Sequence, residues 1–136
     1  MSIVIDASIA LSWALPDEAV DGVDAVLRNG AIGPFWVPAH WRAEIANALL
    51  MSERKKRVTV EQVARLITMI EALEITVDNE GMHDALRRAL PIARAHGLTV
   101  YDALYLELAE RTGRPLASLD SDLLAAAKKV GVTVLP

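Results

Sequence analysis

The sequence predicts an α/β fold: a three-layer α/β/α sandwich with a mostly parallel sheet of about five strands. Two observations lead to this prediction. Short runs of β-branched residues, typical of strands, alternate along the chain with longer amphipathic segments, typical of helices. The first run, residues 2–6, is continuously apolar before its final acid, which is typical of a parallel strand covered on both faces. We expect residues 1–136 to form a single domain, because this length suits one domain of ordinary size.

The first half of the chain carries clear start and stop signals for each element. Pro16 ends a first short helix, and Asn29 with Gly30 ends a second. Thr59 is suited to cap a later helix. The predicted strands are residues 2–6 and 35–37, and the predicted helices are residues 9–15, 17–28, 39–56 and 59–73.

The second half continues the alternation. Glycines that follow periodic segments mark helix ends at Gly97, Gly113 and Gly131, and Pro91 is a point where a helix can restart. The predicted strands are residues 74–77, 115–119 and 132–135, and the predicted helices are residues 82–95, 98–111 and 123–130.

Composition excludes several classes of protein. The absence of cysteine rules out disulfides and thiolate metal sites, and no apolar stretch approaches the roughly 20 residues of a membrane span. The amino terminus lacks the basic region of a signal peptide, so we expect a cytoplasmic protein. The net charge of −4 argues against non-specific nucleic-acid binding over the whole surface. With 53% hydrophobic residues, we expect an apolar patch that a partner covers.

Four acids stand out because each falls at the end of an element or on an apolar face. Asp6 and Asp120 end predicted strands, Asp102 begins the apolar helix of residues 98–111, and Glu44 flanks an apolar helix stripe. Strand ends and helix starts gather at one edge of a parallel sheet. We therefore expect these four side chains to meet in space.

Four carboxylates in one partly buried site repel one another unless cations neutralise them or some stay protonated. Ligation by oxygen alone favours Mg²⁺ or Mn²⁺ over zinc. The matching chemistry is metal-assisted hydrolysis of a phosphodiester, with Asp6, Glu44, Asp102 and Asp120 as metal ligands and catalytic residues. The hydroxyls of Ser8 and Ser118 lie near strand ends and are suited to supporting contacts.

Each of these residues also has a structural interpretation. Asp6 and Asp102 fit helix caps, and Glu44 could pair with an arginine. Asp122 either joins the site or only occupies the first turn of the last helix, and we favour the second interpretation. His40 lies one turn before Glu44, but a histidine beside a core tryptophan is more often structural than a metal ligand.

Two further features bear on partners. The basic run of residues 54–57 is either a solvated helix end or a set of phosphate contacts. Trp13, near the first short helix, is a candidate contact for a protein partner, since aromatic side chains are enriched at interface centres.

The same residues carry a family resemblance. Residues 4–8 (VIDAS), Glu44, residues 98–105 (LTVYDALY) and residues 116–120 (LASLD) resemble the PIN-domain nucleases, in particular the VapC-type toxins of bacterial toxin–antitoxin pairs. The resemblance covers essentially the whole chain. It implies a PIN-like fold and an Mg²⁺- or Mn²⁺-dependent endoribonuclease acting on RNA. It further implies a homodimer neutralised by a small cognate antitoxin protein, with no membrane association.

The resemblance places the family's acids on Asp6, Glu44, Asp102 and Asp120, and its small hydroxyl on Ser118. Two other functions compete with the nuclease. A phosphoaspartyl protein would use Asp6 as nucleophile, but phosphatases of that type have a second Asp where this chain has Ser8. A catalytically silent interaction module would use the acids only as helix caps.

Overall fold

The computed structural model describes residues 2–15, 21–29 and 34–136. Within these residues a five-stranded sheet has the strand order β3-β2-β1-β4-β5, and every neighbouring pair of strands is parallel. The strands are β1 Val4–Ile5, β2 Phe35–Pro38, β3 Ile75–Asp78, β4 Leu116–Ala117 and β5 Val134–Leu135. The predicted α/β class and parallel sheet are confirmed.

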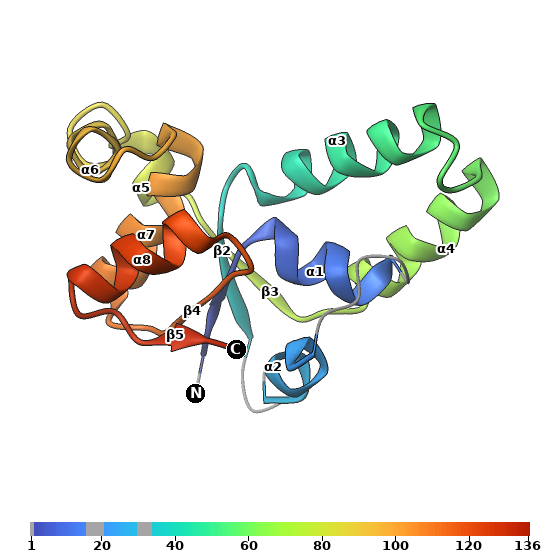
Figure 1. The fold of residues 1–136 in the computed structure, drawn as a ribbon, viewed down its shortest axis with the longest axis horizontal. Coiled ribbons are helices and arrows are strands. Elements are labelled where there is room, and N and C mark those ends of the chain that lie inside the picture. The colour runs from blue at the N-terminus through green and yellow to red at the C-terminus, as the bar shows by residue number, and fades with distance from the viewer. Residues whose placement is uncertain (1, 16–20, 30–33) are drawn as a thin grey trace.

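Helices cover both faces of the sheet, as a three-layer sandwich requires. Figure 1 shows α1, α2 and α4 to the right of the sheet and α6, α7 and α8 to its left. The helices are α1 Ala7–Ala14, α2 Val23–Asn29, α3 Trp41–Arg54, α4 Val60–Glu71, α5 Glu80–His83, α6 Ala89–His96, α7 Val100–Thr112 and α8 Ser121–Lys129. In the described part of the chain, no helix has both the length and the apolar character that crossing a bilayer requires.

The core lies on the central strands and on α7. Val4, Ile5, Leu116 and Ala117 of β1 and β4 are fully buried, as expected of strands covered on both faces. Helix α7 is buried along seven consecutive residues, from Ala103 to Ala109, so nearly every side of it packs against protein. The helix that carries Asp102 is therefore held rigidly beside the sheet.

Two predicted helices differ from the structure. The helix predicted at residues 17–28 begins only at Val23, because Gly22 has a φ of +92°, which is incompatible with a helix; residues 17–20 lie outside the described residues. The helix predicted at residues 82–95 is divided into α5 and α6. Pro91 lies in the first turn of α6, where its missing N–H needs no partner, so it accompanies a helix start instead of interrupting a longer helix.

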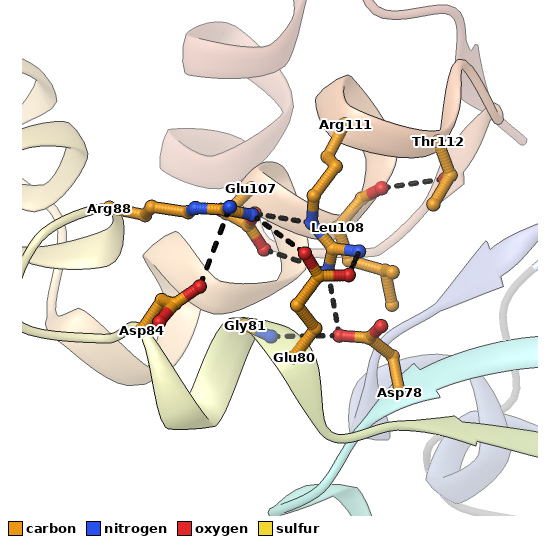
Figure 2. Close-up of polar contacts among 9 residues, drawn as sticks. All are labelled: Asp78, Glu80, Gly81, Asp84, Arg88, Glu107, Leu108, Arg111 and Thr112. Carbon is orange, nitrogen blue, oxygen red and sulfur yellow. Dashed lines mark hydrogen bonds and ion pairs between the residues drawn. The ribbon is translucent and has the colours of Figure 1, made fainter.

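A charged cluster joins α7 to β3 and α5 at the sheet edge (Figure 2). The Arg111 guanidinium donates to Asp78 Oδ2 at 2.7 Å, to Glu107 Oε1 at 2.6 Å and to Glu80 Oε2 at 3.0 Å. The hydrogen bonds to Glu107 and Asp78, the bond to Glu107 foremost, raise the pKa of Arg111 above its usual value. Because Asp78 and Glu107 are both buried, Arg111 is the cation that makes their burial tolerable.

Candidate functional site

The register of the sheet brings Asp6 beside Ser118. Ile5 of β1 is paired with Ala117 of the neighbouring parallel strand β4, so the residues that follow, Asp6 and Ser118, leave the sheet side by side. Both side chains are buried, and Ser118 is completely enclosed. Two residues 112 positions apart in the chain thus meet at the carboxyl edge of the sheet, as predicted for strand ends in parallel sheets.

Two serines hold the Asp6 carboxylate. The Ser8 hydroxyl donates to Oδ1 and the Ser118 hydroxyl donates to Oδ2, each at 2.5 Å. Oδ1 also accepts the backbone N–H of Ile9, so Asp6 caps α1 while remaining part of the site. Burial raises the pKa of Asp6 to about 6, against the opposing effect of the serine hydrogen bonds. The enclosed carboxyl is therefore harder to ionise than an exposed one, and a nearby cation would offset that cost.

Glu44 lies in the first turn of α3 and is half-buried. Its Oε1 atom accepts the Tyr105 hydroxyl at 2.6 Å and lies 3.0 Å from His40 Nε2. Burial alone would raise the pKa of Glu44, but the hydrogen bonds from His40 and Tyr105 outweigh it and hold that pKa below its usual value. Glu44 thus pairs with a histidine and a tyrosine, and the arginine pairing considered from the sequence is wrong.

Asp102 lies in the first turn of α7, whose N-cap is Thr99. The Thr99 side chain accepts the backbone N–H of Asp102 at 3.1 Å, so the cap of this helix is Thr99 and not Asp102. Burial, followed by the negative charge of Asp120, raises the pKa of Asp102. The Asp102 carboxylate is thus held in a negative field.

Asp120 is the N-cap of α8, and its Oδ1 accepts the backbone N–H of Leu123 at 2.9 Å. Asp122 is exposed two residues later, in the first turn of the same helix, as the favoured interpretation predicted. The position beside the helix N-terminus is favourable for both acids.

All four predicted acids line one cavity of about 250 Å³. Its polar lining consists of Asp6, Ser8, Glu44, Asp102, Tyr105 and Asp120. The other residues that line it are alanines and a leucine, so among the described residues no lysine or arginine faces this cavity. Ser118 lies behind Asp6 and supports it.

These side chains surround the cavity but do not form a complete set of metal ligands. Within the described ranges, no three carboxylates or histidines are already arranged to hold one ion. Both oxygens of Asp6 accept serine hydroxyls, and Oε1 of Glu44 accepts the Tyr105 hydroxyl and lies beside the His40 imidazole. The donor set nevertheless fits a hard divalent cation, because it consists of oxygen atoms, carries excess negative charge and includes carboxyls with raised pKa values.

Two polar residues of this region escaped the sequence prediction. The sequence marks Tyr105 only as part of an apolar helix, and it favours a structural role for His40. Spacing could have identified both: Tyr105 follows Asp102 by three residues and His40 precedes Glu44 by four, so each pair shares one helix face.

The other predicted contact residues lie away from the cavity. The basic residues 54–57 are exposed at the far end of α3, roughly 15 Å along the helix from Glu44 at 1.5 Å per residue. Their contact with RNA stays a prediction. Trp13 is partly buried against the core, and its role in partner binding also stays a prediction.

Comparison with known proteins gives a consistent result. A family model described as "PIN domain" matches residues 3–129. The chain is 28% identical to "Ribonuclease VapC3" of Pyrobaculum aerophilum over 100% of both chains. It is 32% identical to "Ribonuclease VapC3" of Mycobacterium tuberculosis, covering 91% of this chain and 86% of the relative.

Solved structures show the same architecture. The crystal structure of PAE2754 from Pyrobaculum aerophilum matches with a TM-score of 0.71 and 25% identity, over 98% of this chain and 83% of that one. The crystal structure of FitAcB from Neisseria gonorrhoeae matches with a TM-score of 0.65 and 16% identity, over 100% of this chain and 97% of that one. At 16% identity, the similarity to FitAcB shows a shared fold alone.

Proposed function

Because this chain belongs to the PIN-domain family, we propose that it is a metal-dependent endoribonuclease and the toxin of a type II toxin–antitoxin pair. The observation that carries the proposal is the cavity at the sheet edge, which four carboxylates surround and to which the described residues supply no lysine or arginine. The curated relatives named as ribonucleases, which align over most of their length, support RNA as the substrate.

In this proposal Asp6, Glu44, Asp102 and Asp120 hold Mg²⁺ or Mn²⁺. A bound cation would supply Lewis-acid chemistry: it would neutralise charge on the phosphoryl oxygens and lower the pKa of a water. Ser8 and Ser118 keep the Asp6 carboxylate in place through their hydrogen bonds. Asp102, whose pKa is raised by burial and by the charge of Asp120, is suited to accept a proton from the attacking water.

The direct test is cleavage of single-stranded RNA by the purified protein in Mn²⁺, in Mg²⁺ and in EDTA, with calorimetric titration of Mn²⁺ in parallel. We expect cleavage with either cation, none in EDTA, and Mn²⁺ binding to the wild-type chain. A protein that bound no Mn²⁺ and left RNA intact would be a silent interaction module. A base-labile phosphoprotein formed from a small phosphodonor would favour the phosphoaspartyl alternative.

A second surface supports the antitoxin partner. A groove of about 310 Å³ runs between α3 and α4, which Figure 1 shows extending away from the sheet as a pair. Its apolar lining consists of Trp41, Ile45, Ala46, Leu49, Leu50, Val63, Ile67 and Ile70. Leu50 and Ile67 are about two-fifths exposed, so the groove is an apolar surface of the kind expected from the composition. It suits the apolar face of an amphipathic helix from the antitoxin.

Replacing Ile67 with Glu should weaken antitoxin binding by about tenfold or more, because a charge would be buried against the apolar partner. Calorimetry with the cognate antitoxin measures the affinity. Val60→Glu is the matched control: it introduces the same side chain at the start of the same helix, outside the groove. Equal affinities for the Ile67 variant and the wild type would contradict this placement. The homodimer expected from the resemblance stays a prediction.

A further inference from the structure

Three side chains from two helices form a compact hydrogen-bonded group beside the cavity. His40 and Glu44 come from the start of α3, and Tyr105 comes from α7. The His40 and Tyr105 rings are tilted against each other with centroids 5.1 Å apart. Tyr105 is 1% exposed and His40 is 9% exposed, so water has little access to the contacts they make.

The contacts determine where the protons lie. His40 Nε2 lies 3.0 Å from Glu44 Oε1 and 3.0 Å from the backbone carbonyl oxygen of Tyr101. Both neighbours are acceptors, so Nε2 must carry a proton and donate to them. The Tyr105 hydroxyl donates to Glu44 Oε1 at 2.6 Å, a distance typical of a charge-assisted hydrogen bond.

Both donors act on the same carboxylate oxygen. Oε1 of Glu44 receives the tyrosine hydroxyl and the imidazole N–H, whereas Oε2 has no protein hydrogen bond within the described residues. Glu44 is an acceptor at this position, so the Tyr105 hydroxyl is the donor of the hydrogen bond between them. The second carboxylate oxygen is left available to a ligand of the cavity.

We propose that Tyr105 and His40 are positioning residues that fix Glu44 by binding Oε1 and so present Oε2 to the divalent cation. The proposal rests on the metal-dependent function proposed above. Groups that orient a metal ligand through its second atom commonly contribute 10- to 100-fold to metal affinity. The hydrogen bond from His40 to the Tyr101 carbonyl oxygen also links the two helices, because it joins the start of α3, which carries Glu44, to the first turn of α7, which carries Asp102.

The first test is the Mn²⁺ dissociation constant of Tyr105→Phe, measured by calorimetry. Phe retains the ring and loses only the hydroxyl, so we expect Mn²⁺ affinity to fall about tenfold. Tyr101→Phe is the matched control, since it removes the same hydroxyl from the same helix at a side chain that is 63% exposed. We expect wild-type affinity in that control. Wild-type affinity in Tyr105→Phe would overturn the role of Tyr105.

A second pair of variants separates positioning from packing at His40. Leu in place of His40 removes the donor, whereas Gln can place its side-chain amide N–H where the imidazole Nε2 lies. We expect Mn²⁺ affinity and RNA cleavage to fall together in His40→Leu and to be largely restored in His40→Gln. Thermal unfolding in EDTA checks that both variants are folded. Equal loss in the two variants would show that the imidazole matters for shape alone, and would overturn its role as a donor.

Failure of this inference can be distinguished from failure of the proposed function. If Asp102→Asn loses Mn²⁺ binding while Tyr105→Phe and His40→Leu bind as the wild type does, only the positioning role is wrong. If the wild-type chain binds no Mn²⁺, the metal-dependent function is wrong and the positioning role is wrong with it.

Discussion

Replacing Asp102 with Asn should lower the rate of metal-dependent RNA cleavage by about a thousandfold. The substitution keeps the size of the side chain and removes one of the four charges around the cavity. A divalent cation stabilises a phosphoryl transition state by several kcal/mol, and a loss of about 4 kcal/mol corresponds to a thousandfold in rate. Initial rates at saturating Mn²⁺ measure the effect.

The fold should survive this change, because the Thr99 cap uses the backbone N–H of Asp102. Removing a carboxyl with a raised pKa should also leave thermal stability in EDTA unchanged or higher. Asp122→Asn is the matched control: the same change at an exposed acid of α8 should leave cleavage unchanged. Cleavage at the wild-type rate by the Asp102 variant would remove this residue from the mechanism.

Replacing Arg111 with Met should destabilise the protein by about 3–5 kcal/mol, which is the usual cost of removing one partner from a buried ion pair. Figure 2 shows Arg111 at the centre of the charged cluster, facing Asp78, Glu80 and Glu107. Without it, the carboxylates of Asp78 and Glu107 would be buried without their nearest cation. Urea denaturation of the metal-free protein measures the free energy of unfolding.

Arg88→Met is the matched control for this prediction. Arg88 contacts two acids of the cluster, Glu80 and Glu107, and also Asp84, but its side chain is 40% exposed and these contacts are 3.4–3.5 Å long. Exposed ion pairs contribute about 0–1 kcal/mol, so this variant should lose little stability. If both variants lost a similar free energy of unfolding, the contribution of each arginine to stability would depend on its charge and not on its burial.

Local sequence signals predicted many element ends correctly. Thr59 was predicted to cap a helix and is the N-cap of α4, because a threonine side chain accepts a backbone N–H that would otherwise be unpaired. The prediction of helix boundaries was wrong where no capping residue marked them. The segment predicted as one helix at residues 82–95 has an apolar pattern along its whole length, yet the helix is interrupted between α5 and α6. At the start of α5, Asp78 accepts the Gly81 N–H and also binds Arg111 of α7, a contact between residues far apart in the chain.

The candidate site was also predicted only in part. The identities of its acids were predicted, because a carboxylate at a strand end or on an apolar face is costly unless it has a partner. Their partners were not predicted: Glu44 pairs with Tyr105, 61 residues away, and not with an arginine. The charged cluster around Arg111 was also missed, since its members come from three separate elements.

The sequence by itself determined the α/β class, the caps of the main helices and the identities of Asp6, Glu44, Asp102 and Asp120 as unusual acids. These properties depend on neighbours within a few positions, where period, capping and burial preference act. Only the tertiary structure decided that β1 lies beside β4, that Ser118 therefore contacts Asp6, and that Tyr105 of α7 donates to Glu44 of α3. Such contacts depend on strand order and helix docking, which arise from packing of the whole chain and have no local signature.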